Sequence, residues 1–123
     1  MSHLVSVKTR VTDPASLSAA CRRLGLAEPV QGTAELFSAS ATGLIVKLPG
    51  WQYPVVADVA SGTLSFDNYN QAWGKQEELD KLLQAYAVER AKAEARRVGH
   101  SVTEQRLDNG SIKLTIQVAG GMA

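Results

Sequence analysis

The feature that most constrains the fold of this chain is an uninterrupted stretch from Lys75 to Val98 that contains no proline or glycine. Alanine, leucine, glutamate, lysine, glutamine and arginine dominate it, and these residues have high helix propensities. The stretch therefore predicts one helix, about 36 Å long at a rise of 1.5 Å per residue, that ends at Gly99. Because most sheets in a small domain are shorter than this, part of the helix has to pack on something else.

The apolar face of this helix changes along its length. Its first half carries large apolar residues at helical spacing, which predicts a face that packs on a sheet: Leu79, Leu82, Leu83 and Tyr86. The same stripe then reaches Arg90 and Arg97, and the apolar side moves to a row of alanines. The alanine half either approaches another backbone closely, in the sheet or in a second subunit, or is a solvated helix end where Arg90 and Glu94 pair. The candidate interface residues are Arg90, Arg97, Ala87, Ala91 and Ala95.

The N-terminal part predicts a strand followed by a short helix. Apolar and polar residues alternate from 5 to 11, which is typical of a half-buried strand. Asp13 and Pro14 suit the start of a helix, and Gly25 suits its end. Cys21 lies in the apolar stripe of this helix, so we expect it to be buried as a small apolar side chain.

Two hairpins are expected further along. If Ser61 and Gly62 form the first turn, Val59 faces Leu64. The second surrounds Asn109-Gly110, the strongest short hairpin signal. A two-residue turn there gives these opposite pairs: Leu107 and Ile112, Gln105 and Leu114, Thr103 and Ile116. Two polar residues then share the apolar face, which predicts an edge strand partly open to water or one that lines an interface.

Together these segments predict an α+β fold in the order β-α-β-β-β-β-α-β-β. We expect a mainly antiparallel sheet with two helices packed on one face. A chain of 123 residues fits a single domain, residues 1–123, with a frayed tail over 118–123.

Charge and cysteine content limit the classes of function. Thirteen Lys and Arg against twelve Asp and Glu give a net charge of +1, so there is no general attraction to nucleic acid or anionic membranes. Cys21 is the only cysteine, which excludes an internal disulfide and favours a reducing compartment. No apolar run is long enough to cross a bilayer. We therefore expect a cytoplasmic protein without membrane attachment.

The segment "FDNYNQAWG" at 66–74 is the richest in functional groups. Its candidate ligand or interaction residues are Asp67, Asn68, Tyr69, Asn70 and Trp73. Asp and Asn bond nearby backbone amides at such junctions, so one interpretation is a structural cap with an aromatic lid. The others are an interaction surface and a catalytic site, for which a proton-transfer partner is needed within hydrogen-bond reach.

Metal and cofactor chemistry lack their usual sequence signals. His3 and His100 are the only histidines and stand in no metal-binding spacing, and no glycine-rich phosphate loop precedes a helix. We predict no metal, no cofactor and no catalytic residues, so the chain is not expected to be an enzyme.

The residues "MSH", "DNYNQAWG", "LLQAYAVERAKAEARRVGHSV" and "LDNGSIKLTIQV" resemble the hypothetical chloroplast reading frame number thirty-five family and its bacterial relatives, a domain of unknown function. The resemblance covers nearly the whole chain. It implies a small soluble protein without an established activity, and an AAA-type ATPase as a partner. Where that family usually reads "DNYGG", this chain reads "DNYNQ".

The hypothesis that follows is a non-catalytic interaction or adaptor protein that associates with itself or with an AAA-type ATPase. One alternative is a nucleic-acid-binding protein that uses the basic helix end, which consists of Arg90, Lys92, Arg96, Arg97 and His100. Another is a small-ligand protein or enzyme with a pocket at the "DNYNQAWG" segment, anchored by Asp58 or Asp67.

Overall fold

The computed structural model describes residues 4–69 and 71–118. Its elements are β1 (Val5–Lys8), α1 (Pro14–Arg23), β2 (Val30–Glu35), β3 (Ser40–Val46), β4 (Val55–Asp58), β5 (Thr63–Phe66), α2 (Gln76–Arg97), β6 (Ser101–Arg106) and β7 (Ile112–Gln117). This is the predicted α+β order. The described residues do not include His3, Asn70 or the tail 119–123. Most of the segment that was predicted to fray, 118–123, therefore lies outside them.

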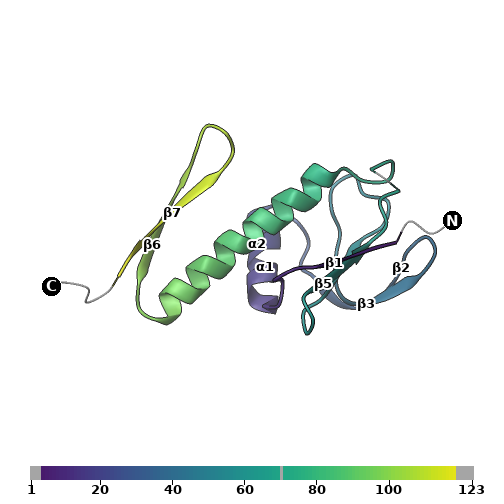
Figure 1. The fold of residues 1–123 in the computed structure, drawn as a ribbon, viewed down its shortest axis with the longest axis horizontal. Coiled ribbons are helices and arrows are strands. Elements are labelled where there is room, and N and C mark those ends of the chain that lie inside the picture. The colour runs from purple at the N-terminus through teal and green to yellow at the C-terminus, as the bar shows by residue number, and fades with distance from the viewer. Residues whose placement is uncertain (1–3, 70, 119–123) are drawn as a thin grey trace.

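The strands form two separate antiparallel sheets rather than one. Five strands make a sheet in the order β1-β5-β4-β3-β2, so β1 and β2 are its edge strands. The last two strands make a two-stranded sheet of their own. Figure 1 shows this hairpin beside the C-terminal half of α2, on the other side of the helices from the five-stranded sheet.

The hydrophobic core lies between the two helices and one face of the larger sheet. Its members from the helices are Leu17, Ala20, Cys21, Leu79, Leu82, Ala85 and Tyr86, and those from the sheet include Val46, Val55, Ala57, Leu64 and Phe66. This confirms that both helices pack against the sheet. Cys21 is fully buried, and burial raises the pKa of its thiol above the ordinary value.

The second half of α2 packs against α1 and the hairpin through a network of ion pairs. Arg23 of α1 bonds Glu89 of α2 at 2.8 Å and Glu104 of β6 at 2.7 Å. Lys92 of α2 lies 3.5 Å from both carboxylates. Because a two-stranded hairpin is marginally stable alone, its position depends on contacts such as this network and the hydrogen bond from the Gln84 side chain to the Gly110 carbonyl at 3.3 Å. No helix among the described residues has both the length and the apolar composition of a membrane span.

The turn between β4 and β5 is longer than predicted. Leu64 lies opposite Ala57, so its predicted pairing with Val59 was wrong. The Asp58 carbonyl accepts a hydrogen bond from the Gly62 amide at 2.8 Å, which closes a loop of four residues instead of two. Gly62 has a φ of +78°, a conformation that glycine adopts without steric cost.

The register of the last hairpin also differs from the prediction. Glu104, not Gln105, lies opposite Leu114. The loop holds one more residue than the predicted two-residue turn, with the Gly110 amide bonded to the Leu107 carbonyl at 3.0 Å and a φ of +86° at Gly110. That is a type I turn followed by a left-handed glycine. A shift of one residue moves every side chain of the strand to the other face.

Candidate interaction groove between the edge strand and the long helix

The "DNYNQAWG" segment forms a loop that bonds to itself before α2 begins. Asp67 and Asn68 are buried. The Asn68 carbonyl accepts a hydrogen bond from the Trp73 amide at 2.9 Å, and its side-chain amide donates to the Gly74 carbonyl at 3.4 Å. The Gln71 side chain accepts a hydrogen bond from the first helical amide, that of Gln76, at 3.1 Å. The carboxamides of Asn68 and Gln71 therefore satisfy backbone groups.

Trp73 lies in an aromatic cluster outside the core. It stacks on Tyr69 with ring centroids 4.7 Å apart and also contacts Phe37 at 5.1 Å and Tyr53 at 5.6 Å. The aromatic that covers the core is Trp51, whose ring lies 5.7 Å from Phe66. The cluster joins three loops that are distant in sequence, a contact that the sequence analysis missed because Phe37 and Tyr53 belong to other segments.

The two carboxylate oxygens of Asp67 differ in their hydrogen bonding. Its Oδ1 accepts a hydrogen bond from the Tyr69 amide at 3.3 Å. Its Oδ2 is buried and has no hydrogen-bond partner among the described residues. Asn70, the remaining candidate in this loop, lies outside those residues.

Strand β1 presents an unpaired backbone edge. Among the described residues it pairs only with β5, and all four of its residues are exposed. The Thr9 amide donates to the Gly62 carbonyl at 2.8 Å, so Thr9 points its backbone groups toward β5. Since these directions alternate along an antiparallel strand, Ser6 and Lys8 point their N–H and C=O groups outward. These two residues define the open edge.

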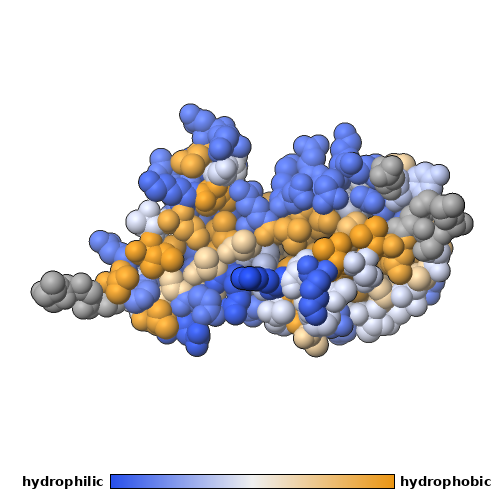
Figure 2. All heavy atoms as spheres, in the orientation of Figure 1, coloured by the Kyte–Doolittle hydropathy of each residue, from blue (hydrophilic) through white to orange (hydrophobic). Residues whose placement is uncertain are grey.

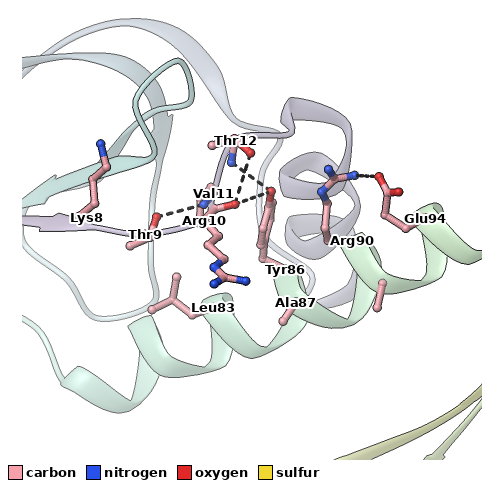
Figure 3. A pocket seen from close by; sticks show the side chains of 11 residues that line it. Lys8, Thr9, Arg10, Val11, Thr12, Leu83, Tyr86, Ala87, Arg90 and Glu94 are labelled. Carbon is pink, nitrogen blue, oxygen red and sulfur yellow. Dashed lines mark hydrogen bonds and ion pairs between the residues drawn. The ribbon is translucent and has the colours of Figure 1, made fainter.

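A groove runs between this open edge and α2. It consists of a larger cavity of about 810 Å³ and a smaller one of about 330 Å³, which share Thr9 and Leu83. The smaller cavity includes Val5 and Val7 of the edge strand, and the larger one continues along α2 (Figure 3). In Figure 2 a band of hydrophobic residues follows α2 across this face and meets the β1 end of the molecule.

The Tyr86 hydroxyl fixes the wall of the groove. It accepts hydrogen bonds from the amides of Thr12 at 3.1 Å and Asp13 at 3.0 Å, and it donates to the Arg10 carbonyl at 3.1 Å. Figure 3 shows the bonds with Thr12 and Arg10, which join the segment after β1 to the middle of α2. One buried side chain therefore joins the segment after the edge strand to the helix.

The predicted interface residues divide into two groups. Arg90, Ala87 and Ala91 line the larger cavity. Ala95 is buried within the chain, while Arg97 is exposed and bonds Glu94 at 2.8 Å. Of the three alanines that were predicted to face a close neighbour, Ala87 and Ala91 line the groove and Ala95 does not.

The basic helix end is largely paired with carboxylates. Arg90 and Arg97 both bond Glu94, and Lys92 lies between Glu89 and Glu104. These contacts neutralise much of the charge that a phosphate backbone would need.

Metal chemistry has no candidate site in the part of the chain that the structure describes, which holds no group of three His, Cys, Asp or Glu side chains placed to share an ion. Comparison with known proteins finds no matching family model, no matching curated protein and no matching solved structure.

Proposed function

We propose that this protein is a non-catalytic interaction module that binds an extended segment of a protein partner in the groove between β1 and α2. The observation that carries the proposal is the open edge of β1 beside a continuous, largely apolar groove. In recognition by strand addition, main-chain hydrogen bonds supply affinity and pockets for alternate side chains supply specificity. The open edge offers the first, and the groove offers the second.

The dimensions of the groove suit a short strand. The four residues of β1 extend over about 13 Å at 3.3 Å per residue. A bound strand of that length would place one set of its side chains over Val7 and Leu83, because alternate residues point to the same face. Its other side chains would stand beside Ser6 and Lys8. A contact of this size is typical of a weak or transient complex rather than an obligate one.

The resemblance of the sequence makes an AAA-type ATPase the first partner to examine, and a second copy of the chain the next. We place this function in the cytoplasm, because a protein whose only cysteine is buried and unpaired needs no oxidising compartment.

The proposal can be tested by removing one outward amide from the edge. Ser6→Pro deletes an N–H that points away from β5, and proline is tolerated on edge strands at such positions. Ser6→Ala is the matched control, because it loses the same side chain but keeps the amide. After affinity purification of each tagged protein from its own cells, the partners of the wild type should remain with Ser6→Ala and be lost with Ser6→Pro. Equal melting temperatures would show that both variants are folded.

A second pair of variants tests the groove itself. Ala87→Glu puts a carboxylate into the larger cavity, whereas Ala93→Glu puts one on the same helix outside it. Alanine and glutamate both favour helix, so stability should change little in either case. We expect loss of partners with the first variant only. If the Ser6→Pro and Ala87→Glu proteins are folded and keep every partner of the wild type, the groove is not the binding surface.

A further inference from the structure

The rim of the groove is positively charged, and this bears on the chemistry of its occupant. Lys8 and Arg10 stand on the β1 side, and neither side chain makes an ion pair within residues 4–69 and 71–118. In Figure 3 the Arg10 side chain points toward α2, beside Leu83 and Ala87, while Lys8 points away from the helix. Two cations therefore flank the open edge, one on each side of the strand.

The acidic side chain of the larger cavity is already paired. Among the described residues, Glu94 is the one carboxylate that lines this cavity. Its oxygens are bonded to Arg90 and, at 2.8 Å, to Arg97, and these bonds lower the pKa of the carboxyl below its ordinary value. Glu94 thus stays charged but is engaged on the helix. The groove keeps an excess of positive charge that its own residues do not balance.

Resting on the proposed function, we infer that the occupant is an extended segment of a different protein in which apolar residues alternate with aspartate or glutamate. A strand paired with β1 would turn every second side chain toward Val7 and Leu83, where apolar residues are favoured. The intervening side chains would lie beside Lys8 on the outer face. Beyond the strand, on the helix side, the Arg10 guanidinium can hold a carboxylate of the residues that follow, through two parallel hydrogen bonds.

The chain's own strands do not fit this description. The hairpin strand β7 alternates apolar residues with Lys113, Thr115 and Gln117, so it would bring a positive charge to the cations of the rim. The other edge strand, β2, carries one acidic residue, Glu35, at its end. A second copy of the chain is therefore a poorer occupant than a partner with an acidic, alternating segment.

The experiment measures binding of labelled synthetic peptides to the whole protein by fluorescence anisotropy. Three peptides of about eight residues, enough to span β1 and the two cavities, alternate valine with glutamate, with glutamine or with lysine. The glutamate peptide should bind about tenfold more tightly than the glutamine peptide, and this preference should shrink as salt is added. The variant Lys8→Gln with Arg10→Gln should lower affinity for the glutamate peptide to that of the glutamine peptide. Arg96→Gln, on another face of α2, is the control and should change nothing.

The outcomes separate the two proposals. If the three peptides bind the wild type equally and Ser6→Pro abolishes all binding, strand addition stands and the preference for acidic segments is wrong. If no peptide binds, or if Ser6→Pro binds as well as the wild type, the strand-addition proposal fails and this inference fails with it. If light scattering shows a wild-type dimer that Ser6→Pro dissociates and the glutamate peptide does not, the groove is occupied by a second copy, which also overturns the inference.

Discussion

Removal of the Tyr86 hydroxyl gives a direct test of how the groove is held. Tyr86 is 5% exposed, and its hydroxyl makes three hydrogen bonds with the backbone between Arg10 and Asp13. In Tyr86→Phe these backbone groups lose their partner, and the exposed position of Thr12 lets water replace part of the loss. At about 1 kcal/mol for each hydrogen bond, and with partial hydration, we expect the free energy of unfolding to fall by about 2 kcal/mol.

Urea titration followed by tryptophan fluorescence measures this loss. With an m-value of about 2 kcal/mol/M, the midpoint should fall by about 1 M. Tyr53→Phe is the matched control, because no hydrogen bond to the Tyr53 hydroxyl is formed within the described ranges and that ring lies in the aromatic cluster. It should cost less than about 0.5 kcal/mol. If Tyr86→Phe costs no more than this control, the hydroxyl does not fix the groove wall, and another contact has to set the spacing of β1 and α2.

Two more predictions concern the residues that hold the loop and the hairpin. A Cβ atom at Gly74 would lie 2.3 Å from the Trp51 ring, so Gly74→Ala should destabilise the fold by about 1–3 kcal/mol in the same titration, and a neutral result would mean that the ring moves freely. The pKa of Glu104 is lowered from its ordinary value of 4.5, mainly by the hydrogen bond from Arg23, so its stabilising effect is complete above that pH and is lost as the pH falls below it. Between about pH 5 and pH 3, the free energy of unfolding of Glu104→Gln should therefore fall less than that of the wild type. If the two proteins lose the same stability over this range, the ion pair between Arg23 and Glu104 does not stabilise the fold.

The elements could be predicted from the sequence because each carries its own local signal. The stretch without glycine or proline gives α2, and the alternating residues near the N-terminus give β1. The placement of the hairpin on α2 could not be predicted in this way. It depends on Arg23 and Glu104, which are far apart in sequence and meet only after α1 and β6 have packed on the long helix.

The errors in the hairpin turns have a local cause. In the first hairpin, the Asp58 carbonyl accepts hydrogen bonds from two amides and so closes a longer loop. In the second, the left-handed conformation of Gly110 permits the longer loop. The sequence offers a two-residue turn at the same sites, and the alternatives differ by little energy. The candidate site shows the same limit. A lysine such as Lys8 on a short strand is common at sheet edges. Nothing in the local sequence shows that β5 is the one strand that pairs with β1 within the described ranges.

The groove exists because α2 changes side-chain size where it passes the end of β1. Leu83 still fills the space beneath the strand, and beyond it Ala87 and Ala91 leave room beside the segment that Tyr86 holds. Larger apolar residues at these two positions would close the cavity, and polar ones would remove its apolar floor. Alanine has the highest helix propensity, so these two positions also suit a helix face that is open to water. The space that the alanines leave between helix and edge strand is the space that the proposed bound chain would occupy.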